Sequence, residues 1–210
     1  MASRYLYLIR HGQFDPDEKA NPRGDLSKIG KRQARAVAKV FKNIPVTHIH
    51  VSTLRRAVQT AEPLIKAFPE AKVEFTTRLL ECIPPLVPEL REQFFRDVTE
   101  EELRGHYWHA ERAFSTYVRR TTGHDRHEIL IAHGNLIRYL VCRAMDVDAT
   151  AWSSLTSFNC GVTRIIVESN GLCSVISYNE LGHLGPELMT DNLYAGFADS
   201  KPPAPVGPTD

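Results

Sequence analysis

Two apolar stretches of this chain each end in a histidine followed by glycine. Leu6–Gly12 reads LYLIRHG, and Ile129–Asn135 reads ILIAHGN. Short apolar runs of this kind are typical of strands buried on both faces in a parallel sheet. The carboxyl ends of parallel strands share one edge of a sheet, which is where open α/β sheets bind ligands. The sequence therefore predicts that His11 and His133 lie together at that edge.

The rest of the chain alternates strand-like and helix-like segments, which predicts a mainly parallel sheet covered on both faces. The fold class that follows is α/β, a three-layer sandwich with helices on both faces of a central sheet and an antiparallel hairpin at its C-terminal end. The expected strands are 48–52, 72–75 and 129–132. The expected helices follow Ser27, span 54–68, begin at Thr99 and reach Arg119 or Arg120, and span 136–145. The hairpin joins 161–168 to 172–178 through Asn170-Gly171.

Local signals refine this outline. Ser27 is placed to cap a helix by accepting a bond from a first-turn amide. Gly30, which costs helix stability, is expected where backbone approaches the first strand closely. Thr99 with Glu102 forms a capping-box pattern. Pro63 predicts a kink in the helix that contains it.

The 210 residues, 42% hydrophobic and 24% charged, are enough for a single domain with a substantial core. We expect one catalytic domain over 1–195. The tail over 196–210 contains Pro202, Pro203, Pro205 and Pro208 with little apolar content, which predicts disorder.

Charge and cysteine content limit the partners that we expect. The formal net charge of +1 gives no general attraction for nucleic acid, so anion binding requires a local cluster of basic residues. The apolar runs are strand-sized, shorter than the roughly 20 residues of a membrane span, so we expect no direct membrane insertion. The chain shows no secretory signal, and its cysteines lack metal-site spacing; both observations predict a cytoplasmic protein. The cysteines are Cys82, Cys142, Cys160 and Cys173.

His48 and His50 alternate along a predicted strand and would face the same side of the sheet. That geometry can bind a metal, but no third ligand has recognisable spacing, so the structural interpretation is favoured and no metal site is predicted. His106, Trp108 and His109 either line a substrate mouth or belong to an amphipathic helix over the core.

Five ordered segments carry a family resemblance. Arg-His-Gly alone is a weak signal, whereas the ordered set resembles the histidine phosphatase superfamily over roughly residues 4 to 190. The segments are LIRHG at 8–12, LSKIG at 26–30 with Gln33-Ala34, STLRRAVQTA at 52–61, Leu80-Glu81, and AHGN at 132–135.

The resemblance implies phosphoryl transfer without a metal or cofactor, and the residue types suit that chemistry. A phosphomonoester dianion needs fixed positive charge before a nucleophile can approach, and the guanidinium forks of Arg10 and Arg56 can supply it. His11 is the implied nucleophile. His133 and the amide of Gly134 are expected to hold a phosphoryl oxygen in the transition state.

Glu81 matches the family's proton donor, which protonates the leaving oxygen and later takes a proton from water. That role needs a raised pKa. The apolar neighbours Ile83, Pro84 and Pro85 would raise the pKa of Glu81, whereas Arg10 or Arg56 nearby would lower it.

Each of these residues also has an ordinary interpretation. Taken singly, the two arginines are surface ion-pair partners more often than phosphate ligands, and a lone histidine is more often structural than nucleophilic. Asn135 and Asn159 serve either to order the pocket or to cap and turn the chain. The combined pattern is what favours the catalytic interpretation.

The C-terminal part, from His133 to Arg164, is similar to the mitochondrial phosphoglycerate-mutase-like protein serine/threonine phosphatase branch. That branch carries an N-terminal membrane segment, which is not expected here, and a serine after the catalytic histidine, where this chain has Gly12. The resemblance implies a homodimer, although no sequence pattern specifies one.

The predicted function is metal-independent hydrolysis of a phosphomonoester through phosphorylated His11, on a phosphoprotein or a small phosphomonoester. A phosphoglycerate-type mutase is disfavoured because the stretch between Glu81 and His133 is short for an enclosing cap. A binding or regulatory protein without turnover is disfavoured by the complete set of candidate catalytic residues.

Overall fold

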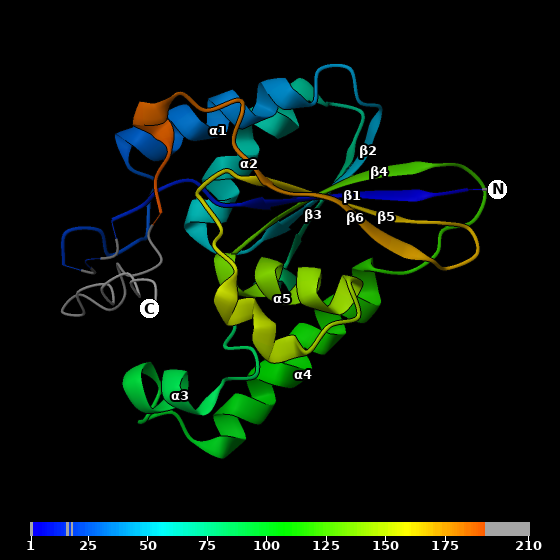
Figure 1. The fold of residues 1–210 in the computed structure, drawn as a ribbon. Coiled ribbons are helices and arrows are strands. Elements are labelled where there is room, and N and C mark those ends of the chain that lie inside the picture. Colours follow the sequence, from blue (N-terminus) through cyan, green and yellow to red (C-terminus); the bar gives the residue numbers. More distant parts are fainter. Residues whose placement is uncertain (1, 16, 18, 192–210) are drawn as a thin grey trace, which may run out of the picture.

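A six-stranded sheet runs through the centre of the molecule (Figure 1). The protein is described from a computed structural model, which describes residues 2–15, 17 and 19–191. The spatial order of the strands is β3-β2-β4-β1-β5-β6. The first four strands in this order are parallel, and β5 runs antiparallel to both of its neighbours. The strands are β1 (Arg4–Arg10), β2 (Val46–Ser52), β3 (Lys72–Thr76), β4 (Arg126–Ala132), β5 (Val162–Val167) and β6 (Cys173–Glu180).

Helices cover both faces of this sheet, which confirms the predicted three-layer α/β sandwich. Figure 1 shows α1 and α2 on one face and α4 and α5 on the other, with α3 beside α4 and away from the sheet. Short 3-10 helices occur over 77–79, 149–154 and 186–188. The helices are α1 (Lys28–Val40), α2 (Arg55–Ala67), α3 (Pro88–Phe94), α4 (Glu100–Tyr117) and α5 (Gly134–Ala144).

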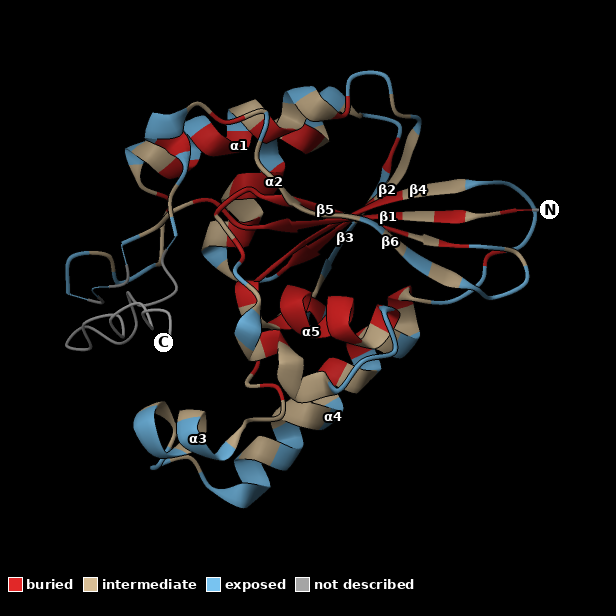
Figure 2. Cartoon of the chain, in the orientation of Figure 1, coloured by how far each residue is buried: buried red, intermediate tan, exposed pale blue. Residues whose placement is uncertain are grey.

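The core lies on both faces of the two central strands, which are mostly buried in Figure 2. Leu8 and Leu130 pack toward α4 and α5, whereas Ile9, Ile129 and Ile131 pack toward α1 and α2. Successive side chains of a strand point to opposite faces, so a strand buried on both sides needs an unbroken apolar run. The apolar runs over 6–9 and 129–132 have this property.

The two helix caps and the hairpin predicted from the sequence are present, and Pro63 lies inside α2. Ser27 Oγ accepts from the amide of Gly30 at 3.0 Å at the start of α1. Thr99 and Glu102 form both bonds of the capping box that begins α4. The strands β5 and β6 form the predicted antiparallel hairpin, and Gly171 in its turn has φ +93°.

Gly30 lies at a close approach between α1 and the loop after β1. A Cβ atom on Gly30 would stand 2.1 Å from the carbonyl oxygen of Gln13, and one on Gly12 would stand 2.8 Å from the carbonyl oxygen of Gly30. Two glycines therefore let the helix contact the backbone that follows the first strand, as predicted for Gly30.

Several boundaries differ from the sequence-based expectations. β2 begins two residues earlier than predicted and β4 begins at Arg126, because backbone pairing continues beyond the apolar core. α5 begins at Gly134, and α4 ends at Tyr117 rather than at Arg119 or Arg120. α3 was not predicted; it is short, has no buried residue and begins at Pro88, a residue suited to a first helical turn.

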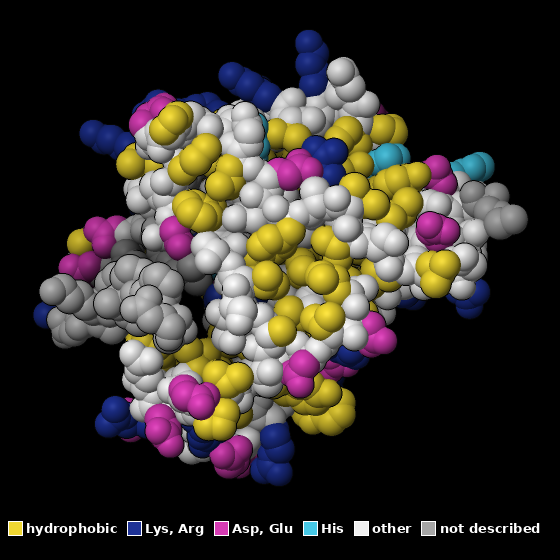
Figure 3. Space-filling model, in the orientation of Figure 1, with side chains coloured by type: hydrophobic (Ala, Val, Ile, Leu, Met, Phe, Trp, Pro, Cys, Tyr) yellow, Lys and Arg dark blue, Asp and Glu magenta, His cyan; other side chains and the backbone are white. Residues whose placement is uncertain are grey.

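The space-filling view shows one face of the molecule, on which Lys and Arg side chains are spread around the outline with Asp and Glu among them (Figure 3). None of the helices in the described part of the chain is both long and apolar enough to span a bilayer. The predicted disordered tail over 196–210, and the end of the predicted domain at 195, lie outside the described residues.

Candidate active site

His11 and His133 meet at the carboxyl ends of β1 and β4. Their ring centroids are 5.0 Å apart, and both residues are buried. The two strands are adjacent and parallel, with Arg10 paired to Ala132, and the amide of His11 donates to the carbonyl of Ala132 at 3.0 Å. The predicted convergence of the two histidines is confirmed.

The ring of His11 is held at both nitrogens. Nδ1 lies 2.8 Å from the carbonyl oxygen of Gly12, a contact in which only a protonated Nδ1 can donate. Nε2 then carries the lone pair, and it accepts from Nε of Arg56 at 3.1 Å. Burial holds the pKa of His11 well below its usual value, and His133, Arg10 and Arg56 lower it further. His11 is therefore a neutral imidazole with a defined tautomer.

The ring of His133 is held at one nitrogen only. Its Nε2 lies 2.8 Å from the hydroxyl oxygen of Ser52, while its buried Nδ1 has no hydrogen-bond partner in the described part of the chain. Burial, followed by Arg56 and Arg10, also holds the pKa of His133 well below its usual value. The unpartnered nitrogen is available to a ligand.

Two guanidinium groups border the histidines. The buried Arg10 donates to the carbonyl of Ser157 and lies 3.4 Å from Asp191 Oδ1, and its Nε has no hydrogen-bond partner among the described residues. Arg56 covers the ring of Phe14, with 4.5 Å between the guanidinium carbon and the ring centroid. Burial lowers the pKa of Arg56, and Arg10 lowers it as well. A buried and a half-buried guanidinium group close enough for one to lower the pKa of the other are arranged for an anion.

Glu81 lies in the same site, since its charge raises the pKa of both Arg10 and Arg56. Its carboxylate accepts from three backbone amides, those of Cys82 at 3.2 Å, Leu136 at 3.2 Å and Asn135 at 3.4 Å.

Burial is the largest influence on Glu81 and raises its pKa, against the opposing amides and Arg10. The balance that the sequence left open is therefore on the side of a raised pKa. Two of the amides belong to the first turn of α5, so this helix terminus is directed at the carboxylate of Glu81. Gly134, whose amide was expected to assist His133, packs against Arg10: a Cβ there would stand 3.4 Å from Arg10 Nε.

Other side chains fix the loops around the site, and sequence reasoning gave them no role. Thr60 Oγ1 accepts from the amide of Gly12 at 2.9 Å and donates to the carbonyl of Arg56 at 2.7 Å. Gln33 Oε1 accepts from the amide of Gln13 at 2.8 Å. Thr60 and Gln33 stand within the ordered motif segments, as Ser52 does, which is the only sequence signal that could have singled them out.

The two asparagines have structural partners. Asn159 Nδ2 donates to the carbonyl of His11 at 2.9 Å, and Asn135 Nδ2 donates to the carbonyl of Cys82 at 3.2 Å. Both hold backbone segments that carry candidate catalytic residues, which agrees with the pocket-ordering interpretation.

The remaining sequence candidates lie apart from this constellation. Both ring nitrogens of His50 contact carboxylates, Glu74 at 3.1 Å and Glu128 at 3.3 Å. Within residues 2–15, 17 and 19–191, no group of three His, Cys, Asp or Glu side chains could hold a metal ion. On α4, Trp108 is 59% exposed and His109 contacts the carbonyl of Leu80 at 3.2 Å.

Comparisons with known proteins agree with this geometry. Residues 6–93 and 87–180 match the histidine phosphatase superfamily, branch 1. The mitochondrial serine/threonine-protein phosphatase Pgam5 of Caenorhabditis briggsae is 30% identical over 194 residues, covering 90% of this chain and 67% of that protein. The human mitochondrial serine/threonine-protein phosphatase PGAM5 is 27% identical over 201 residues, covering 90% and 66%.

Solved structures share the fold. Bacillus stearothermophilus YhfR has a TM-score of 0.67 at 20% identity, covering 87% of this chain and all of that one. Phosphoserine phosphatase from Entamoeba histolytica, in complex with 3-phosphoglyceric acid, has a TM-score of 0.65 at 19% identity, covering 87% of this chain and 100% of that one.

One expectation from the sequence is overturned by these findings. The cytoplasmic location was wrong, since the relatives above are named as mitochondrial proteins. The fold, the motif segments and the sequence match agree on one classification. The chain belongs to the histidine phosphatase superfamily, and it is an enzyme of the phosphatase class.

Proposed function

We propose that this protein hydrolyses phosphomonoesters through a covalent phosphohistidine on His11, without a metal, and that its substrate is a phosphoprotein or a small phosphomonoester. The observation that carries the proposal is the state of His11: a buried neutral imidazole whose Nδ1 donates to Gly12 and whose Nε2 lone pair faces Arg56. A fixed tautomer of this kind is the form in which histidine acts as a nucleophile.

The substrate dianion binds where the positive groups converge. Its nonbridging oxygens take the donors of Arg56, Arg10 and His133, two of which have a buried nitrogen without a partner. When the N–H of Arg56 turns to a phosphoryl oxygen, the lone pair on His11 Nε2 is released toward phosphorus. The same donors stabilise the charge that develops on the oxygens in the transition state.

Two displacements complete the reaction. In the first, His11 Nε2 forms a bond to phosphorus, the bond from phosphorus to the leaving oxygen breaks, and that oxygen takes the proton of Glu81. In the second, Glu81 takes a proton from water, the water oxygen bonds to phosphorus, and the P–N bond returns its electron pair to Nε2. The raised pKa of Glu81 suits both halves, because the group must start protonated and end protonated.

Phosphoprotein is the substrate class that the relatives' names favour, since they are called serine/threonine-protein phosphatases, and those names also favour a mitochondrial location. A homodimer, implied by the branch resemblance, stays part of this proposal.

The test is trapping of the intermediate. Protein mixed with p-nitrophenyl phosphate and quenched in alkali should carry one phosphoryl group by intact-mass spectrometry, mapped to His11. His11→Asn should lack both the adduct and turnover, whereas His124→Asn, which replaces an exposed imidazole in the loop before β4, should keep both. Activity that survives in His11→Asn, or that disappears with a chelator, would contradict the proposal. A panel of phosphopeptides and phosphorylated metabolites then assigns the substrate class.

A further inference from the structure

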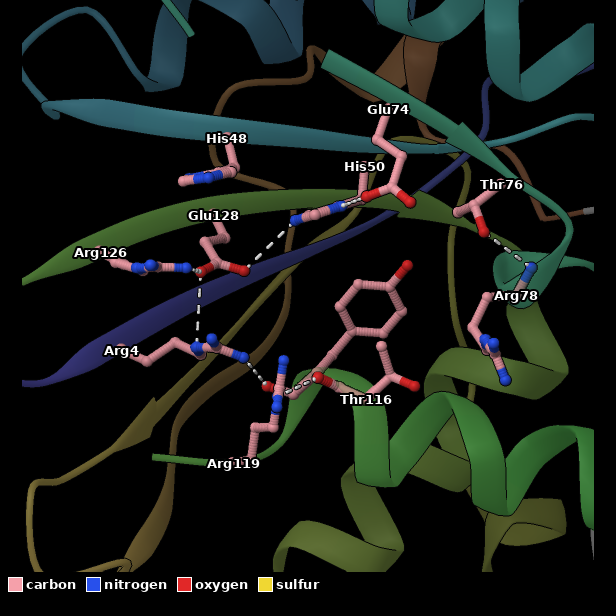
Figure 4. Close-up of a pocket in the computed structure, with 11 residues that line it drawn as sticks. Arg4, His48, His50, Glu74, Thr76, Arg78, Thr116, Arg119, Arg126 and Glu128 are labelled. Carbon is pink, nitrogen blue, oxygen red and sulfur yellow. Dashed lines mark hydrogen bonds and ion pairs between the residues drawn. The ribbon is translucent and has the colours of Figure 1, made fainter. Parts of the chain in front are cut away.

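A polar cavity of about 200 Å³, apart from the candidate active site, lies between the sheet and the C-terminal end of α4 (Figure 4). Arg4 and Arg126, the first residues of β1 and β4, line it together with Arg119 from the loop after α4. None of the candidate catalytic residues lines it. Arg4 and Arg126 place the cavity at the amino ends of β1 and β4, whereas His11 and His133 follow the carboxyl ends of the same two strands.

Its carboxylates are already engaged. Glu128 is buried and lies 3.4 Å from Nε of Arg4 and 3.3 Å from Nε2 of His50. Glu74 lies 3.1 Å from the other ring nitrogen of His50. Figure 4 shows these contacts gathered on the sheet side of the cavity.

The guanidinium groups exceed the carboxylates beside them. Arg126 lies 3.8 Å from Glu128, the same carboxylate that pairs with Arg4. Arg119 stands beside Arg4 in Figure 4. Its Nε donates to the carbonyl of Thr116 at 2.9 Å. Within the described residues, Arg119 forms no ion pair with a carboxylate. Arg4 and Arg126 therefore share Glu128, and Arg119 adds a guanidinium group with no carboxylate of its own among the described residues.

The positive charges of Arg119 and Arg126 lower the pKa of the buried Arg4. Arg4 is 5% exposed, and its NH1 is committed to the carbonyl of Tyr117 at 2.9 Å. Its pKa is lowered by burial first, and the charges of Arg119 and Arg126 lower it further against Glu128. Arg10 and Arg56 stand in the same relation at the candidate phosphate site, where like charges close together favour an anion.

We propose that this cavity is a second anion site, which binds one tetrahedral oxyanion of the phosphate or sulfate class among Arg4, Arg119 and Arg126. Guanidinium forks match the oxygens of such an ion. The volume is below the range of roughly 300–1,000 Å³ typical of drug-sized ligands, so the site suits a single small ion. The bound ion joins the start of β1 and β4 to the end of α4.

The test separates this site from the catalytic one. Inorganic phosphate is titrated by calorimetry into protein carrying Arg56→Gln, which weakens the candidate active site. This protein should still bind phosphate in the cavity lined by Arg4, Arg119 and Arg126. Adding Arg119→Gln and Arg126→Gln should weaken that binding by about tenfold or more. The matched control adds Arg104→Gln and Arg112→Gln, which remove the same charge from exposed positions of α4 outside this cavity, and should leave binding unchanged. Circular dichroism verifies that each variant is folded.

Absence of phosphate binding in the Arg56→Gln protein, or equal binding in the two multiple variants, would overturn the proposal. A titration with O-phosphoserine in place of inorganic phosphate distinguishes a site for a phosphate ester from a site for the free ion. Binding of either one that depends on Arg119 and Arg126 supports the site. With Arg56 intact, Arg119→Gln/Arg126→Gln should keep turnover of p-nitrophenyl phosphate within about twofold, because neither arginine belongs to the catalytic constellation. The proposed function is tested by turnover in His11→Asn, and the anion site is tested by phosphate binding in the Arg119 and Arg126 variants. Either proposal can therefore fail without affecting the other.

Discussion

The hydroxyl oxygen of Ser52 lies 2.8 Å from Nε2 of His133, and both residues are fully buried. A neutral imidazole carries its proton on one nitrogen only, so the group at Nε2 decides what Nδ1 can do. If Ser52 donates its hydroxyl proton to Nε2, the proton of His133 resides on Nδ1, the nitrogen without a partner. His133 can then donate to a phosphoryl oxygen without becoming charged.

Ser52→Ala should therefore lower kcat by about tenfold with little change in KM, because the correct tautomer of His133 is no longer enforced. The loss should be smaller than the ~10²–10³ typical when an oxyanion donor itself is removed. Steady-state kinetics on p-nitrophenyl phosphate measure the effect, and ¹⁵N chemical shifts of the His133 ring report the tautomer. Thr53→Ala, which removes an exposed hydroxyl from the next position, is the control. An unchanged kcat, or an unchanged ring tautomer, in Ser52→Ala would remove this role.

Replacement of Glu81 by Gln should harm substrates with poor leaving groups most. An alkyl phosphate such as a phosphoserine peptide needs a proton on the departing oxygen, so its turnover should fall by about 10²–10⁴, whereas p-nitrophenyl phosphate should lose less. Because the pKa of Glu81 is raised, wild-type kcat/KM should decline as the pH rises through that pKa, and Glu81→Gln should lack this decline. Glu101→Gln, an exposed carboxylate on α4, is the comparison. Equal losses for both leaving groups would exclude the acid role.

The two central histidines should make the fold sensitive to acid. Their pKa values are lowered in the folded protein, so the unfolded chain binds more protons as pH falls below about 6.5, and their contribution to stability is lost on acidification. Each contributes up to about 1.4 kcal/mol per pH unit to that slope. Free energies of unfolding can be measured by urea denaturation between about pH 5 and 7. The plot of this free energy against pH should be shallower for His11→Gln/His133→Gln than for wild type. Parallel slopes would show that neither imidazole is held neutral by folding.

Two helical glycines should respond to alanine with opposite signs. Gly30→Ala forces a Cβ into the carbonyl of Gln13, a backbone clash expected to cost about 1–3 kcal/mol, more than the gain in helix propensity of about 1 kcal/mol. Gly105 in α4 has no atom within 4 Å of its Cβ position, so Gly105→Ala should stabilise the protein by about 0.5–1 kcal/mol. Free energies of unfolding from urea titrations decide the signs. A stabilised Gly30→Ala protein would mean that α1 does not press on the loop after β1.

Much of the fold follows from patterns local in the sequence. The apolar runs before His11 and His133 required strands buried on both sides, and parallel neighbours of that kind must bring their ends together. The caps at Ser27 and Thr99 form within a single helical turn, so they could be predicted from adjacent residues. α3 could not, because a short helix without a buried face leaves no periodic signal.

The protonation states of the site were decided by tertiary structure alone. The pKa of Glu81 depends on burial by distant segments and on amides of α5, more than fifty positions away in the chain. The contact between His133 and Ser52 joins the ends of two separate strands, and the cluster of Arg4, Arg119 and Arg126 depends on three separate elements. The sequence by itself determined which residue types reach the sheet edge, because a short apolar run is enough to predict a buried strand and the residues that follow it. Only the folded chain decided which of them are charged, because charge depends on solvent exclusion and on neighbours brought from far along the chain.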